Sequence, residues 1–122
     1  MSNLITEEVI ADWVGRYEKA WRTTSPDDIA AVFTADAQSH EWPYEADWIG
    51  LDAIIDGWKS REPWQSSGWT FAWEMLAING DTFALNGIAA YDEIGTFNNL
   101  WVVTLKEDGR CSILRLWINE VE

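Results

Sequence analysis

His40 and Glu41 are the strongest candidates for acid/base chemistry in this sequence. His40 is the only histidine, so it is the one side chain expected to titrate near neutral pH without help from its surroundings. A carboxylate such as Glu41 can also accept a proton when a cavity holds it beside a substrate. Both belong to a run expected to be a short strand, 37–42, in which neighbouring side chains point to opposite faces. Only one of them can therefore enter a given cavity, and the sequence leaves both choices open.

Other catalytic and cofactor-binding patterns are missing. A single histidine with no second His or Cys close by makes a poor metal site, and the single cysteine, Cys111, rules out an internal disulfide and a cysteine-built zinc centre. The sequence has no Gly-x-Ser-x-Gly elbow and no glycine-rich phosphate loop. We therefore expect no metal and no cofactor, and a packing role for the cysteine.

Ten tryptophans in 122 residues need an explanation. An indole combines a large apolar surface with one N–H that requires an acceptor when it is buried. That combination suits a pocket wall or an interface as well as a core. We expect most of these residues to pack in the core, and the set as a whole to include some that line a cavity or a dimer contact.

The N-terminal half predicts three helices and one short strand. An amphipathic helix begins after Thr6 and ends near Thr23, and a short helix begins at Ser25-Pro26, where a cap residue precedes a proline at the first helical position. The short strand over 37–42 ends at a proline and is followed by a loop over 44–49. A third helix covers 50–61.

Three turn signals divide the second half at nearly even spacing, at 79–81, 93–95 and 107–109. Between them lie strand-length runs rich in Trp, Phe, Val, Ile, Leu and Thr, which predicts an antiparallel meander of four strands. Both faces of these runs are largely apolar, so both need cover. Helices can cover one face and a partner chain the other. The expected fold is a single α+β domain over residues 1–122.

The charge limits the kinds of partner. The chain carries 21 acidic and 8 basic residues, a formal net charge of -13. Such a surface repels nucleic-acid phosphates and anionic membranes, so neither partner is expected. No basic-then-apolar leader and no run long enough to cross a bilayer is present, which favours a cytoplasmic location.

The order of these elements and several short phrases resemble the SnoaL-like branch of the nuclear transport factor 2-like superfamily. The phrases are 33–37 after the short helix, 50–54 at the third helix, Asn79-Gly80-Asp81 at the first hairpin, and 100–103 followed by 108–110. The resemblance covers about residues 6–117. It implies a cone-shaped α+β roll with a cavity at its wide end and dimerisation through the sheet. It implies no single activity, because the superfamily contains isomerases, dehydratases, cyclases, hydrolases and carriers.

The steroid isomerase branch of that superfamily implies roles for particular residues. Its oxyanion-donating tyrosine corresponds to Tyr17, and its general-base aspartate corresponds most closely to Glu41. Its second oxyanion donor, an aspartate, falls on Trp101. An indole N–H is a weaker donor than a protonated carboxylic acid, which argues against steroid-type isomerisation.

The same analogy assigns faces to the last two long strands. The inward positions would be Asn99, Trp101 and Val103 on one, and Leu114, Leu116 and Ile118 on the other. Arg115 and Trp117 then lie on the outer face, where an Arg beside a Trp suits a subunit interface. We therefore expect a homodimer through that face.

Three functional hypotheses remain open. The first is a binding module for a small hydrophobic molecule, with a pocket formed by Trp42, Tyr44, Trp58, Asn86, Asn99, Trp101 and Leu116. The second is a cofactor-independent isomerase, cyclase or dehydratase that uses Tyr17 with either His40 or Glu41. The third is a non-catalytic dimeric interaction module.

Overall fold

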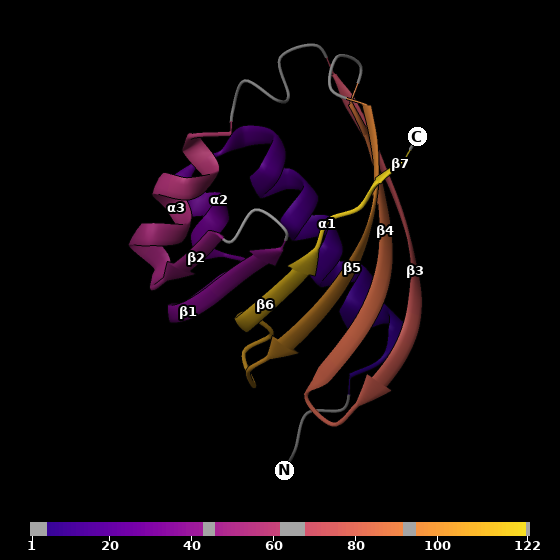
Figure 1. Cartoon of the computed structure of the whole chain (residues 1–122). Coiled ribbons are helices and arrows are strands. Elements are labelled where there is room, and N and C mark those ends of the chain that lie inside the picture. The colour runs from indigo at the N-terminus through magenta and orange to yellow at the C-terminus, as the bar shows by residue number, and fades with distance from the viewer. Residues whose placement is uncertain (1–4, 43–45, 62–67, 92–94, 122) are drawn as a thin grey trace.

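The structure is a computed structural model that describes residues 5–42, 46–61, 68–91 and 95–121. Three helices precede a long sheet (Figure 1). The helices are α1 (Glu7–Thr23), α2 (Pro26–Ala30) and α3 (Leu51–Lys59). The strands are β1 (Phe33–Trp42), β2 (Ala46–Ile49), β3 (Trp69–Asn79), β4 (Thr82–Tyr91), β5 (Gly95–Leu105), β6 (Cys111–Trp117) and β7 (Glu120–Val121).

Helix α1 has the ends that the sequence predicts. The Thr6 hydroxyl accepts a hydrogen bond from the Val9 N–H at 3.2 Å, and Glu7 and Glu8 follow in the first turn, where the helix dipole favours negative charge. The helix ends at Thr24, whose left-handed backbone (φ 49°) lets its N–H donate to the Ala20 carbonyl. One apolar face of α1 is buried against the sheet.

The two shorter helices also form where expected. Ser25 precedes α2, but its side chain makes no cap hydrogen bond. Instead the Asp28 carboxylate accepts from the Thr23 hydroxyl at 2.7 Å, which ties α2 to the end of α1. Helix α3 begins after Gly50, whose φ of 92° strongly favours glycine.

The meander is confirmed as strands β3 to β6. Turns at 79–81 and 107–109 connect β3 to β4 and β5 to β6, and the pairs β3–β4, β4–β5 and β5–β6 are all antiparallel. The middle turn signal falls mainly on residues outside the described part of the chain. With the helices on one side of a curved sheet, the α+β fold class is confirmed (Figure 1).

The edge formed by β1 and β2 differs from the expectation in two ways. Strand β1 spans 33–42 rather than 37–42, and the loop expected over 44–49 contains β2, which pairs with 38–41. Strand β1 also lies parallel to β6, so the sheet is mixed, with the order β2-β1-β6-β5-β4-β3 and β7 beside β5. A parallel pair needs a long crossover, and here strands β2 to β5 and helix α3 separate β1 from β6 in the chain.

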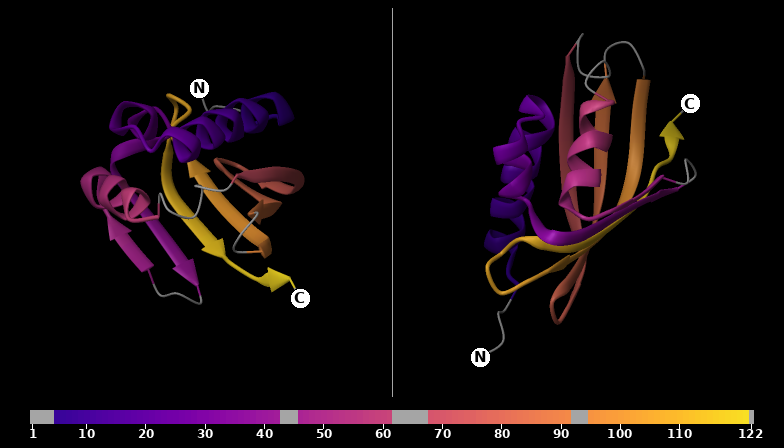
Figure 2. Two further views of the ribbon diagram at one scale, coloured as in Figure 1. Left: turned by 90° about the horizontal axis from the view of Figure 1, so that it is seen from above. Right: turned by 90° about the vertical axis from the view of Figure 1, so that its left-hand side faces the viewer.

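The three helices lie on the concave side of the sheet (Figure 2). The convex side carries exposed apolar residues, including Leu76, Ile88, Leu100 and Trp117. No helix within the described residues has the length and apolarity needed to cross a bilayer.

Trp13 lies at the centre of the region that we call the packed end, formed by Trp13, Arg16, Val32 and Cys111. The Trp13 indole is fully buried, and its N–H donates to the Val32 carbonyl at 3.2 Å. The same carbonyl accepts from the Cys111 N–H at 2.8 Å, so one oxygen immediately before β1 connects α1 to β6. Burial raises the pKa of the Cys111 thiol, which makes it unreactive, as its packing role requires.

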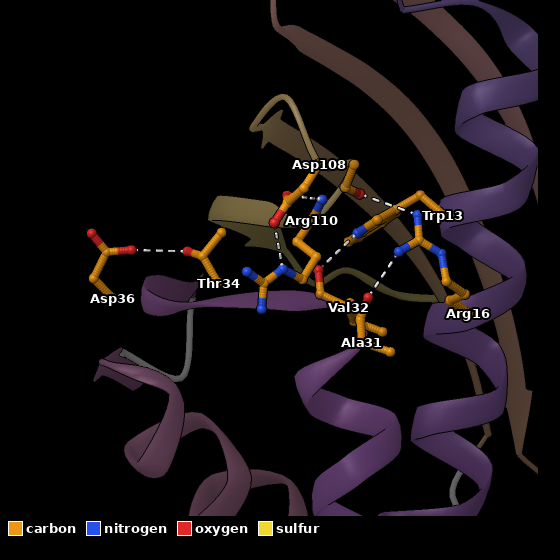
Figure 3. A network of polar contacts seen from close by, with 9 residues as sticks. Trp13, Arg16, Ala31, Val32, Thr34, Asp36, Asp108 and Arg110 are labelled. Atoms are coloured by element: carbon orange, nitrogen blue, oxygen red, sulfur yellow. Dashed lines mark hydrogen bonds and ion pairs between the residues drawn. The ribbon is translucent and has the colours of Figure 1, made fainter.

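Arg16 closes the packed end from the side (Figure 3). Its guanidinium donates from Nη1 to the Ala31 carbonyl at 2.8 Å and from Nη2 to the Gly109 carbonyl at 3.1 Å. It also forms an ion pair with Asp12 at 3.1 Å. One side chain of α1 thereby joins the end of α2 to the turn between β5 and β6.

Candidate functional site

A cavity of about 60 Å³ lies between α1, α3 and the inner face of the sheet. Space for one water is roughly 15 Å³ on this measure, so the cavity has room for about four waters. Half of the described residues that line it are aromatic. They are the tryptophans Trp21, Trp48, Trp58, Trp69 and Trp101, together with Tyr17, Phe71, Tyr91 and Phe97.

The helices bring their aromatic residues into contact at the centre of this wall. The Tyr17 ring lies 4.9 Å from the Trp58 ring and 4.5 Å from the Trp101 ring, measured between centroids. Trp21 meets Trp58 edge to face at 5.2 Å, and its N–H donates to the Tyr91 hydroxyl at 3.0 Å. Helical spacing places Tyr17 and Trp21 on one face of α1, one turn apart, so both reach the cavity.

Two glycines let the wall aromatics approach the backbone closely. A Cβ added at Gly57 in α3 would lie 2.3 Å from the Trp48 ring. One added at Gly87 in β4 would lie 2.9 Å from the Phe71 ring and 3.0 Å from Trp101 Nε1. Any larger residue would therefore displace these rings, so both glycines help to set the shape of the cavity.

The cavity contains a buried ion pair. Glu41, on β1, is only 4% exposed, and Arg61 follows the end of α3. Arg61 Nη1 lies 2.5 Å from Oε1 and 2.6 Å from Oε2 of Glu41, and only the contact with Oε2 has hydrogen-bond geometry. The guanidinium also lies over the Trp48 ring at 4.9 Å. Arg61 is thus held by an aromatic face and a carboxylate together.

Burial dominates the electrostatics of this site. It raises the pKa of Glu41, and the Arg61 charge and hydrogen bond partly oppose that rise. Burial also raises the pKa of Tyr17 well above its usual value, with the Glu41 charge acting in the same direction. The phenol is therefore a neutral hydrogen-bond donor at neutral pH.

The lining also includes the polar side chains of Glu18, Ser39, Asn99 and Trp101. The Asn99 Oδ1 accepts from the Asn119 N–H at 3.3 Å, which fixes the orientation of the amide because a backbone N–H can only donate. The Trp101 indole is 3% exposed, and its N–H has no acceptor among the described residues. No hydrogen bond involving the Tyr17 hydroxyl occurs within the same part of the chain.

The structure brings together six of the ten residues singled out from the sequence. Tyr17, Glu41, Trp58, Asn99, Trp101 and Leu116 all line the cavity. Glu41 faces inward with Ser39 because inward and outward positions alternate from Ala37 onward along β1.

Three of the other four residues lie elsewhere. His40 points to the opposite face of β1, where Nδ1 lies 2.6 Å from Asp47 Oδ1 and Nε2 lies 3.1 Å from Gln38 Oε1. Trp42 shares that face and stacks on Trp117 at 4.9 Å. Asn86 is paired in register with the exposed Leu100, so it faces outward. Tyr44 lies outside the described residues.

Sequence reasoning missed Arg61, Trp48 and Tyr91. Arg61 was the last residue of the predicted third helix and was given no role, and its partner lies 20 positions away in the chain. Trp48 stood in a segment interpreted as a loop, and Tyr91 next to a turn. No local pattern in the sequence marks any of them.

The arrangement can hold a small molecule against flat apolar walls, with a carboxylate, a guanidinium, a phenol and an amide as polar contacts. Glu41 with its raised pKa is also placed to exchange a proton. Among the described residues no group of three or more His, Cys, Asp or Glu side chains could hold a metal ion.

Comparison with known proteins identifies the fold. No protein-family model and no curated protein matches the sequence. Solved structures do match. A protein of unknown function with a cystatin-like fold from Methylobium petroleophilum PM1 aligns over 98% of this chain and 82% of its own, with 12% identity and a TM-score of 0.74.

Two further matches carry functional names. A candidate isomerase of the SnoaL-like family from Agrobacterium tumefaciens str. C58 has 13% identity and a TM-score of 0.72, over 92% of this chain and 98% of its own. A candidate polyketide cyclase from Sinorhizobium meliloti has 21% identity and a TM-score of 0.63, over 86% of this chain and 93% of its own. At these identities the likeness concerns the fold. The resemblance to nuclear transport factor 2-like and SnoaL-like proteins is confirmed at that level.

Proposed function

We propose that this protein binds a small, largely apolar molecule in the aromatic-lined cavity. One observation carries the proposal: the cavity wall contains the Glu41–Arg61 pair. A buried ion pair adds little to stability compared with apolar residues of the same size. Its presence inside a largely apolar wall, half of it aromatic, is better explained by recognition of a ligand.

The size of the cavity limits the ligand. A void of about 60 Å³ accepts the polar end of a molecule, or a molecule of only a few heavy atoms. Trp48 and Trp69 line the cavity and are only half-buried, so a flat body can extend between such rings toward solvent. A single-ring aromatic compound is therefore the natural first probe.

The test is a titration with single-ring aromatic compounds, followed through the NMR signals of the tryptophan indole N–H groups. We expect saturable shifts with Kd values between about 1 mM and 1 µM for ligands of this size. Leu116→Phe should fill the cavity and abolish the shifts, whereas Leu100→Phe, on the convex face, should leave them intact. Shifts that persist in Leu116→Phe would place binding elsewhere and reject the proposal.

Acid/base catalysis is a second candidate, favoured by the raised pKa of Glu41 beside the neutral phenol of Tyr17. Such a pair can remove a proton next to a carbonyl while donating a hydrogen bond to the oxygen. Cyclohexanone in D₂O would report this step by loss of its α-proton NMR signals. Exchange above the buffer rate that is lost in Glu41→Gln supports catalysis. Equal exchange in both proteins leaves a binding function only.

A homodimer through the convex face, including Arg115 and Trp117, is a further proposal. Trp117 is 37% exposed, and Leu76, Ile88 and Leu100 are exposed on the same sheet. Large exposed apolar patches usually mark interaction surfaces. Sedimentation should detect a dimer that Trp117→Glu converts to monomer. A wild-type protein that stays monomeric at high concentration would rule this interface out.

A further inference from the structure

We infer that the ligand's polar group is a neutral hydrogen-bond donor, a hydroxyl or an N–H, that binds the Glu41 carboxylate. This inference rests on the binding function proposed above and specifies the chemical class of the ligand. Its basis is the unfilled hydrogen-bonding capacity of Glu41.

The Glu41 carboxylate has more acceptor capacity than the protein uses. Its two oxygens offer about four acceptor sites. Within the described residues one atom, Arg61 Nη1, supplies a hydrogen bond with proper geometry, and it goes to Oε2. Oε1 is in ion-pair contact with the same Nη1 at 2.5 Å, but it is buried and has no hydrogen-bond partner with proper geometry there. A buried carboxylate oxygen without a donor is unfavourable, so the contents of the cavity must provide one.

The charges at the site favour a neutral ligand over a charged one. The formal charges of Glu41 and Arg61 cancel, and both groups are at most 14% exposed at the side chain, whereas Glu18, the third charged residue along the wall, is only half-buried and remains in contact with solvent. An anionic ligand would approach the ionised carboxylate, and the guanidinium that could receive it is already engaged by Trp48 and Glu41. A cationic ligand would approach that guanidinium. Either would also lose its hydration on entering an aromatic cavity.

The experiment compares four probes of similar shape: phenol, toluene, benzoate and benzylammonium. In a purely apolar cavity toluene would bind better than phenol, because the phenol hydroxyl must leave water. With Glu41 as the acceptor, we expect phenol to bind about tenfold more tightly than toluene. Benzoate and benzylammonium should bind more weakly than phenol. Indole N–H titrations supply all four Kd values.

Two variants test the role of Glu41. Glu41→Leu combined with Arg61→Leu removes both charges together, so neither is left buried alone. There the preference should reverse in favour of toluene. Glu41→Gln keeps one acceptor oxygen and should reduce the phenol preference without reversing it. The dispersion of the indole signals shows whether the double variant folds. If it does not fold, Glu41→Gln alone tests the inference.

The outcomes separate this inference from the function on which it depends. Toluene binding as tightly as phenol to the wild type, or benzoate or benzylammonium binding best, overturns the inference while binding in the cavity stands. A preference for phenol that survives in the double variant also overturns it. Failure of all four probes to shift any indole signal rejects the binding function for ligands of this size, and the inference with it.

Discussion

The packed end and the cavity use the same residue types in opposite ways. Trp13 and Trp101 touch, with ring centroids 6.2 Å apart, and both are almost fully buried. The Trp13 N–H donates to a carbonyl, whereas the Trp101 N–H has no acceptor among the described residues. Arg16 donates to two backbone carbonyls, whereas Arg61 pairs with a buried carboxylate beside a void.

This contrast separates residues that stabilise the fold from residues available to a ligand. At the packed end the Trp13 N–H and the two terminal nitrogens of Arg16 join elements that are distant in the chain, and only Arg16 Nε lacks a hydrogen-bond partner among the described residues there. In the cavity Trp101 Nε1 and one oxygen of Glu41, Oε1, have no hydrogen-bond partner among the described residues, at a cost in stability that a folded protein normally avoids. Differences in hydrogen bonding therefore distinguish the two regions better than composition does.

The largest expected effect comes from replacing each tryptophan by phenylalanine. Trp13→Phe loses volume in a closely packed site and also a buried hydrogen bond, so we expect the free energy of unfolding to fall by about 2–4 kcal/mol. Trp101→Phe loses similar volume but removes a buried donor that has no partner, so we expect a loss of about 1–2 kcal/mol. Urea unfolding measures both. Equal losses would mean that the Trp101 N–H is satisfied and that the contrast is absent.

Adding a single methyl group to the cavity wall should destabilise the protein. In Gly87→Ala the new Cβ would crowd the Phe71 ring and Trp101 Nε1, so these side chains must move. We expect the free energy of unfolding to fall by about 1–3 kcal/mol. Shifted indole N–H signals should report the movement.

The matched control is Gly15→Ala on the exposed face of α1. Nothing lies within 4 Å of a Cβ added there, and alanine is the better helix former. We expect a gain of about 0.5–1 kcal/mol. A Gly87→Ala protein that is as stable as the wild type would show that the wall has room to relax.

The sequence predicted the elements whose signals are local. The long amphipathic face of α1, its Thr6 cap and the turns at 79–81 and 107–109 depend on neighbouring residues only. Strand β2 and the parallel pairing of β1 with β6 depend on backbone contacts with distant segments, and no periodicity reports those. The register shift between 33 and 38 lengthens β1 in a way that residue types alone do not reveal.

The same limit applies to the candidate site. The sequence predicted that His40 and Glu41 lie on opposite faces of the strand. Which of the two faces inward depends on how β1 is set in the sheet. Trp101 and Asn99 were placed inward through the family resemblance, and the structure has both on the cavity wall. Arg61 could not be predicted, because its contact with Glu41 exists only after α3 packs beside β1.

Arg16 provides a smaller test of the packed end. Arg16→Met keeps the apolar stem and removes the hydrogen bonds to Ala31 and Gly109, so we expect a loss of about 1–2 kcal/mol in urea unfolding. Arg110→Met is the control, because its ion pair with Asp108 is exposed and lies within one turn. That change should cost less than about 0.5 kcal/mol. A comparable loss in both variants would remove the special role of Arg16.

The smallest effect is the pH dependence contributed by Glu41. Burial raises its pKa in the folded state, so the folded protein holds this proton more tightly than the unfolded chain does. Between the unfolded pKa, about 4.5, and the higher folded pKa, stability should therefore fall as the pH rises. A single proton limits this slope to about 1.4 kcal/mol per pH unit.

Glu41→Gln isolates that contribution, because the amide does not titrate. Urea unfolding across the pH series gives the free energy of unfolding of the wild type and of the variant. The wild-type value minus the variant value should decrease with rising pH in this window and be constant above it. Below the unfolded pKa the difference should also be constant, since both states then carry the proton. A difference that increases with pH would mean that Arg61 outweighs burial and that the carboxylate is stabilised within its own pair. The cavity would then resemble the packed end, where the Trp13 N–H and the terminal nitrogens of Arg16 are bound by the protein itself.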